Sequence, residues 1–157
     1  MSRTTEQQRV SAFRFPETRS AGHAAPARSP LAEPPMELRV TSGFQRTPEQ
    51  WTVPKQLVAH CTSGRVVIDF TTAHCTRREI DLELHAGSGT VVIVVPRGWR
   101  VDLEGVRRGA DATVTDRVSM PRFPGAPLIR VVGQLETGVV KARYAYRSPM
   151  EWLRRSR

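Results

Sequence analysis

The 157-residue sequence lacks a long hydrophobic run and is poor in aromatic residues and cysteine. Its longest apolar stretch, Val91 to Val95, is far shorter than the roughly 18 residues that a membrane-spanning helix needs. No hydrophobic segment follows Arg3 and Arg9, so no secretory signal is predicted. Two cysteines, Cys61 and Cys75, do not make a disulfide framework. We therefore expect a cytoplasmic protein with reduced thiols and no transmembrane segment.

Lysine is also scarce, so arginine supplies almost all of the positive charge. The only lysines are Lys55 and Lys141, and the net charge is +9. Residues 1–60, 61–146 and 147–157 each carry a net charge of +3, from 8 basic and 5 acidic, 12 and 9, and 4 and 1 residues. A basic protein suggests nucleic acid or an anionic surface as partner, but binding of this kind favours a concentrated patch. Arginine-mediated binding of nucleic acid or an anionic surface therefore stays an alternative.

Residues 1–36 lack the apolar periodicity of a packed segment. Residues 21–35 consist mainly of small residues and prolines, which cannot bury enough surface to offset an ordering cost of about 1–2 kcal/mol per residue. Phe13 and Phe15 are the bulky side chains here, and a short binding motif around them is the alternative to plain disorder. We predict a disordered tail over 1–36, a folded domain over 37–147 and a short helix over 148–157.

Short apolar runs with a period of two begin near residue 36. Ile80, Leu82 and Leu84 would share one face of a strand, and Asp81 and Glu83 the other. The same alternation occurs at 36–40, 57–59 and 101–104, and no long helical period competes with it. These patterns predict an all-β domain whose strands have one buried face.

An internal repeat of 25 residues relates two of these segments. Residues 63–68 read SGRVVI and residues 88–93 read SGTVVI, and the same offset aligns 57–60 with 82–85. Weaker echoes follow two later glycines. Each glycine is expected to form a sharp turn by adopting positive φ. The predicted turn residues are Gly64, Gly89, Gly109 and Gly138.

Repeats of this length are typical of solenoids, in which each coil covers the apolar face of the next. We predict a short β-solenoid of about four coils, with an antiparallel β-sandwich as the alternative. Three prolines over 117–127 exclude a central strand there and predict a protruding loop.

The C-terminal residues carry a helix-start signal. Ser148 at the N-cap, Pro149 at the first helical position and Glu151 at the third form a capping box. A helix this short needs a docking surface, and we expect it to cover the last coil. Insertion into a membrane interface is the alternative. The residues expected to dock are Met150, Trp152 and Leu153.

Histidine and cysteine recur together at two places. His60, Cys61, His74 and Cys75 could in principle hold zinc. Neighbouring residues on a strand point to opposite faces, however, and the 14-residue offset differs from the 25-residue repeat. We therefore predict no metal site, no cofactor and no disulfide, with both cysteines packed as small apolar residues.

Catalytic patterns are weak. Glu83 could approach Asp102 or Glu104 on stacked coils, as acidic pairs do in some β-helix enzymes that act on polysaccharides. Arginines flank the same strands. We therefore expect these carboxylates and Asp81 to lie on solvated strand faces, in ion pairs with the arginines. Ser88 lacks the spacing of a nucleophile elbow. No catalytic residue is assigned and no enzyme is predicted, with a glycan-acting enzyme as a remote alternative.

The spans WTVP at 51–54, SGRVVIDF at 63–70 and PRGW at 96–99 resemble the LiaF-like C-terminal domain, of the cell-wall-active antibiotic response family. The same module occurs in actinobacterial proteins, and the resemblance covers about residues 51–147. It implies a single-stranded right-handed β-helix without catalytic residues, which modulates envelope-stress signalling by protein contact. We therefore expect a non-enzymatic protein-binding or scaffold domain. Self-association through the solenoid ends and peripheral membrane contact are further expectations.

Overall fold

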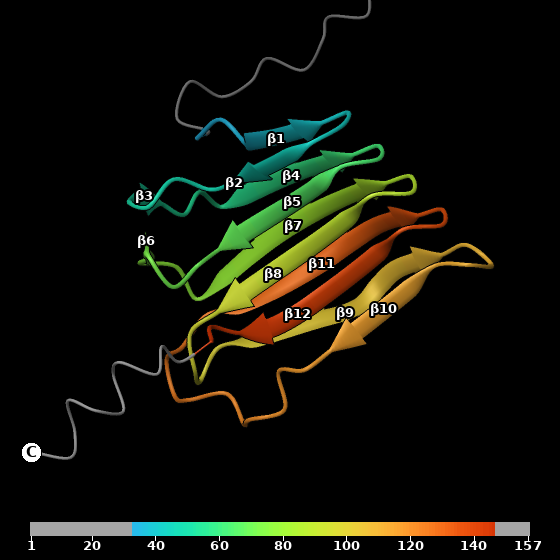
Figure 1. Cartoon of the computed structure of the whole chain (residues 1–157). Helices are drawn as coiled ribbons and strands as arrows, with labels where there is room; N and C mark the ends of the chain where they lie inside the picture. Colours follow the sequence, from blue (N-terminus) through green and yellow to red (C-terminus); the bar gives the residue numbers. More distant parts are fainter. Residues whose placement is uncertain (1–32, 147–157) are drawn as a thin grey trace, which may run out of the picture. The chain divides into compact units, whose positions relative to one another are not determined.

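The computed structural model describes residues 33–146, and within that range the chain forms twelve β-strands and no helix (Figure 1). Each pairing between these strands is parallel. The all-β prediction is therefore confirmed, whereas the antiparallel β-sandwich is wrong. The strands are β1 (Met36–Val40), β2 (Phe44–Arg46), β3 (Trp51–Thr52), β4 (Gln56–Cys61), β5 (Arg65–Asp69), β6 (Ala73–His74), β7 (Glu79–Ala86), β8 (Thr90–Val95), β9 (Arg100–Arg108), β10 (Thr113–Asp116), β11 (Leu128–Leu135) and β12 (Val139–Tyr144).

The strands build two five-stranded sheets and one small sheet. Sheet 1 has the order β1-β4-β7-β11-β9, sheet 2 has the order β10-β12-β8-β5-β2, and β3 pairs with β6. Apart from β3 and β6, successive strands alternate between sheets 1 and 2, so they form five strand pairs rather than about four. The last pair, β11–β12, lies between β7–β8 and β9–β10, so the spatial order departs from chain order (Figure 1).

The core lies between sheets 1 and 2, because the predicted alternation places apolar side chains there. In β7, Ile80, Leu82 and Leu84 are fully buried, and Asp81 is exposed on the other side. Strand β8 differs, because every residue after Thr90 is buried. The valines of β8 whose side chains point to the outer face of sheet 2 are therefore buried as well.

The 25-residue repeat is the register in which neighbouring strands pair. Leu57 lies opposite Leu82 in sheet 1, and Val66 lies opposite Val91 in sheet 2. The first strand pair follows the same plan with an offset of 21 residues, since Val40 pairs with Cys61. The sequence pattern missed this pair because Gln45 and Arg46 stand in β2 where β5 has Val66 and Val67.

The turns between sheets 1 and 2 bring glycines of neighbouring strand pairs into close contact. A Cβ on Gly64 would lie 2.5 Å from the carbonyl oxygen of Gly43. A Cβ on Gly89 would lie 2.9 Å from the Gly64 oxygen and 2.4 Å from Cys61 Sγ. A Cβ on Gly138 would lie 2.3 Å from the Gly89 oxygen. The glycine column, Gly43, Gly64, Gly89 and Gly138, therefore leaves no room for side chains at its last three positions.

The predicted role of these glycines was wrong in its mechanism. Positive φ occurs at Gly43, at 92°, but not at the four predicted turn glycines. Gly109 also lies outside the glycine column. The amide of Thr113 donates a hydrogen bond to the carbonyl oxygen of Gly138, so residue 112, not Gly109, stands in register with Gly138. The close approach of neighbouring turns of the chain, rather than a left-handed conformation, thus excludes a side chain at Gly64, Gly89 and Gly138.

The segment between β10 and β11 contains no strand, as its prolines predict, but it does not simply protrude. Val118 is buried, and Phe123 packs so closely over Gly98 that a Cβ there would lie 2.1 Å from its ring. Arg122 donates a hydrogen bond of 3.1 Å to the carbonyl oxygen of Arg78. These contacts fasten the segment to the ends of sheets 1 and 2.

The remaining predictions concern the N-terminal tail and the C-terminal helix. Met36, assigned to the tail, is the first residue of β1. Residues 1–32 and the expected C-terminal helix, with Ser148, Met150, Glu151, Trp152 and Leu153, lie outside the described residues. A search of residues 33–146 for a helix of membrane-spanning length and hydropathy found none.

Substituting Gly89 tests the glycine column. Gly89→Ala should lower the free energy of unfolding by about 2–3 kcal/mol. The new Cβ would clash with the Gly64 carbonyl oxygen and with Cys61 Sγ, and the structure cannot relieve both contacts. Ser88→Ala is the matched control at the exposed neighbouring position and should change it by less than about 0.5 kcal/mol. Urea unfolding measures both values, and equal stability of the two variants would contradict the packing described.

Candidate binding face

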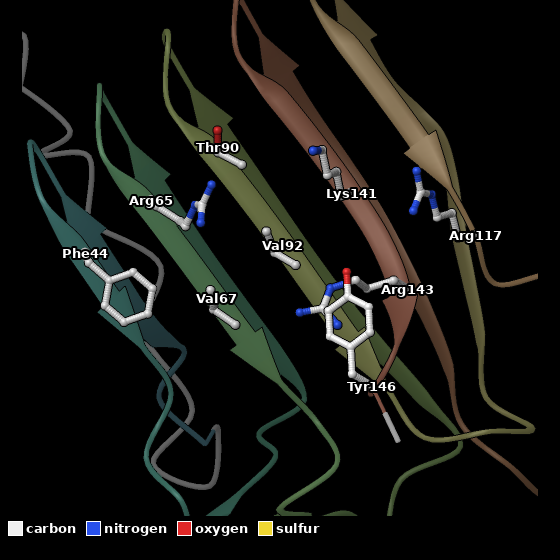
Figure 2. A pocket seen from close by; sticks show the side chains of 9 residues that line it. All are labelled: Phe44, Arg65, Val67, Thr90, Val92, Arg117, Lys141, Arg143 and Tyr146. Atoms are coloured by element: carbon white, nitrogen blue, oxygen red, sulfur yellow. The ribbon is translucent and has the colours of Figure 1, made fainter. Parts of the chain in front are cut away.

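The outer face of sheet 2 carries a shallow depression of about 310 Å³, which we call the basic trough (Figure 2). It crosses β2, β5, β8 and β12 and reaches the end of β10. Nine residues line it: Phe44, Arg65, Val67, Thr90, Val92, Arg117, Lys141, Arg143 and Tyr146.

Strand alternation and register bring these side chains to one face. Phe44, Arg65 and Thr90 are direct neighbours across β2, β5 and β8. In the next outward row, Val67 lies opposite Val92, and Val92 lies opposite Lys141. Residues distant in sequence thereby form one surface, because each strand contributes its outward-pointing positions.

Two aromatic side chains stand out from the surface of the basic trough. Phe44 is 66% exposed and Tyr146 is 79% exposed. The guanidinium carbon of Arg143 lies 4.1 Å from the centroid of the Tyr146 ring, in cation–π contact. Val67 and Val92 lie lower, and Val92 is only 8% exposed. The trough therefore has an apolar floor and amphipathic walls (Figure 2).

The lining of the basic trough has charge of one sign. Arg65, Arg117, Lys141 and Arg143 are cationic, and no carboxylate is among the nine lining residues. A second depression of about 440 Å³ continues from it and shares Phe44, Val67, Arg143 and Tyr146. Cations on one strongly positive surface favour an anionic partner.

Asp69 is the one acidic residue lining the second depression, and its charge is already matched. Its carboxylate accepts hydrogen bonds of 2.5 Å from Arg46 and of 2.5 Å from the Thr71 hydroxyl. The side chain is 6% exposed. Burial by itself would raise the pKa of Asp69, but the bonds from Thr71 and Arg46 outweigh it and hold the pKa below the ordinary value. Because the charge of Asp69 is matched by Arg46, it does not neutralise the cations that line the basic trough.

The outer face of sheet 1 presents the two repeat histidines as a stacked pair. The rings of His60 and His85 have centroids 4.9 Å apart and an interplanar angle of 11°. His85 lies 2.7 Å from Glu83, and His60 lies 3.6 Å from Glu37. Within residues 33–146, no three or more potential ligands gather in a geometry that could hold a metal ion.

The residues considered for zinc do not all lie on one face of the domain. Cys61 is buried in the core, whereas His60 lies on the outer face of β4. Cys61 and Cys75 are both free thiols. Burial raises the pKa of the Cys61 thiol, which donates a hydrogen bond of 3.3 Å to the carbonyl oxygen of Gly64. Cys61 thus packs beneath the glycine column.

The carboxylates considered for glycan chemistry lie on strands that are not neighbours. Glu83 is on β7, Asp102 and Glu104 are on β9, and β11 runs between them. Arg130 of β11 lies in register between Asp81 and Asp102. Insertion of β11 therefore separates the pairs that a sequential stack would have brought together.

The sequence reasoning did not single out Phe44, Arg143 or Tyr146. A signal was present for Phe44, because it follows Ser42-Gly43 as Arg65 follows Ser63-Gly64. Extending the repeat to this first strand pair would have placed Phe44 and Arg65 side by side on an outward row. No comparable signal existed for Tyr146, which lies beyond the end of β12.

Comparison with curated proteins finds two similar chains of Mycobacterium tuberculosis. Uncharacterized protein MT0994, from strain CDC 1551 / Oshkosh, is 30% identical over 133 residues. Uncharacterized protein Rv0966c, from strain ATCC 25618 / H37Rv, is 29% identical over 133 residues. Each alignment covers 83% of this chain and 62% of the relative, so the chain spans less than two thirds of the relatives it matches. Similar proteins therefore occur in actinobacteria.

No family model matches the chain. No solved structure matches it either.

Replacing the buried carboxylate tests its electrostatic role. Asp69→Asn should lower the free energy of unfolding at neutral pH by about 1–3 kcal/mol, because the pair with Arg46 is lost. The contribution of Asp69 is present above its unfolded pKa of about 3.9 and is lost as pH falls through its lower folded pKa.

The stability difference between the parent protein and Asp69→Asn should therefore shrink as pH falls below about 4. Denaturant unfolding across this range measures it, with Glu104→Gln on the exposed surface of β9 as the control that stays near the parent. A difference that is independent of pH would contradict the role given to Asp69.

Proposed function

We propose that this chain is a non-enzymatic binding domain that acts by protein contact, with the basic trough as its contact surface. The observation that carries the proposal is the joining of four cations, an apolar floor and two exposed aromatic side chains on one sheet face. Arginine and aromatic residues are the types that contribute most to protein interfaces. A surface of this composition supports recognition of a partner protein.

We also infer that sheets 1 and 2 form a short β-solenoid of the LiaF-like kind. Alternation of successive strands between two parallel sheets supports it, as does the in-register 25-residue repeat. The resemblance over about residues 51–147 adds envelope-stress signalling as the setting in which the domain would act. In that setting the domain modulates a partner by occupying it and performs no reaction.

Binding of nucleic acid or of an anionic surface is the second candidate. The same cations favour it, and exposed aromatic rings can stack with bases on single-stranded nucleic acid. Its weakness is the mixed charge elsewhere, because Glu79, Asp81, Glu83, Asp102 and Glu104 all lie on β7 and β9. The positive lining of the basic trough therefore stands beside strands of mixed charge, which suits a partner of limited size.

Site-specific photo-crosslinking in the native cell tests the proposed function. A photoreactive phenylalanine analogue in place of Phe44 should give a discrete crosslinked protein. The same analogue in place of Val132, which is 48% exposed on the outer face of sheet 1, is the matched control and should give none. The crosslink at Phe44 should disappear when Lys141→Glu and Arg143→Glu reverse the charge of the trough.

Equal crosslinking from both positions, or a Phe44 crosslink that survives charge reversal, would refute the basic trough as the contact surface. A crosslink to nucleic acid in place of protein would favour the second candidate.

A further inference from the structure

We propose that the basic trough takes an extended acidic polypeptide segment that carries apolar side chains. This inference rests on the proposed function and names the chemistry of the partner. The lining supplies cationic groups and an apolar floor together, with no carboxylate among its nine residues. An occupant that satisfies both must itself combine carboxylates with apolar groups.

Apolar positions lie beside cationic ones across the trough. In one outward row, Val67 and Val92 precede Lys141. In the next row, which belongs to the second depression, buried Val94 lies in register between Asp69 and Arg143, and Asp69 is already paired with Arg46. Carboxylates can pair with Lys141 and Arg143, while apolar side chains pack beside them on the valines of the neighbouring strands. A peptide with mixed acidic and apolar residues matches this spacing of charge.

The dimensions of the trough suit a short extended segment. From β2 to β10 the order of sheet 2 contains four strand-to-strand steps. Steps of about 4.8 Å give a path of roughly 19 Å. An extended chain rises about 3.3 Å per residue, so about six residues cross the trough. Phe44 stands at one end of this path and Arg117 at the other (Figure 2).

Charge complementarity argues against the rest of this chain as the occupant. Residues 1–32 carry 5 basic and 2 acidic residues, and residues 147–157 carry 4 basic and 1 acidic residue, so each segment has a net charge of +3. A segment that complements the basic trough must therefore come from another source.

A second copy of the chain is also a poor occupant. Of the twelve acidic residues within 33–146, six lie on the strands of sheet 1, where several already have partners. Glu37 pairs with Arg39, Glu79 with Arg130, and Glu83 with His85. Docking sheet 1 against the basic trough would have to break these pairs, so a separate acidic protein fits better.

A polynucleotide fits less well than an acidic peptide. Its phosphates form a uniform charged track, whereas β8, with Val92 on its outward face, separates Arg65 of β5 from Lys141 and Arg143 of β12. One face of the Tyr146 ring is already in contact with Arg143, which leaves less aromatic surface for stacking bases.

Fluorescence anisotropy with the full chain and synthetic probes tests the inference. The first probe is a labelled peptide of about eight residues in which aspartate and glutamate alternate with leucine. The second has serine in place of each leucine, the third is an oligothymidylate of similar length, and vesicles of phosphatidylglycerol form the fourth. The leucine peptide should bind best, and the serine peptide about tenfold more weakly.

Charge reversal of the trough supplies the matched variants. Lys141→Glu with Arg143→Glu should weaken binding of the leucine peptide by at least about tenfold. Arg107→Glu on β9 of sheet 1, with Arg108→Glu beside it, makes the same change of charge elsewhere and should alter affinity less than about twofold. Urea unfolding of each variant verifies that it is folded.

Stronger binding of oligothymidylate or of vesicles than of the leucine peptide would overturn the inference. So would equal binding of the leucine and serine peptides, or equal losses in the two double variants. If no peptide binds while the Phe44 crosslink to a protein persists, this inference fails and the proposed function stands. If the crosslink also fails, both are wrong.

Discussion

The close contact between glycines of neighbouring strand pairs is the constraint on which the rest of the structure depends. Where Gly64, Gly89 and Gly138 turn from sheet 1 into sheet 2, each lies against the carbonyl oxygen of the preceding member of the column. The same oxygens accept backbone hydrogen bonds from Arg65, Thr90 and Val139. A Cβ at these positions would push the strand pairs apart at the turn. Because register in a parallel sheet decides which side chains reach each face, this contact also aligns the outward rows of sheet 2.

The opposite faces of the two sheets have different chemistry although both come from the same alternating pattern. Sheet 1 presents carboxylates with arginine and histidine partners, such as Glu79 with Arg130 and Glu83 with His85. Sheet 2 presents cations above buried valines, and Asp69, the acidic residue of the second depression, is already paired with Arg46. This asymmetry is the basis on which we propose a binding role for sheet 2, since its charges lack partners within the trough lining. The evenly spread charge along the sequence becomes a one-sided charge distribution through folding.

Much of the local structure could be predicted from the sequence, because burial of alternate residues leaves a direct trace in β7 and in the 25-residue repeat. The stacking order could not, because β11 bears no mark that places it between β7 and β9. The role of the glycines was also missed in part, since a sequence reveals a missing side chain but not the carbonyl oxygen that fills its space. The basic trough depends on long-range register, which joins Phe44, Arg65 and Lys141 across four strands. Periodicity within one strand carries no such information.

Scalar couplings across hydrogen bonds in solution NMR test the stacked glycine turns most directly. The account predicts couplings from the amide nitrogen of Thr90 to the carbonyl carbon of Gly64, and from that of Val139 to that of Gly89. The second coupling also reports the placement of β12 beside β8, and hence the departure from chain order. Couplings of these amides to antiparallel partners, or their rapid exchange with solvent, would contradict the account.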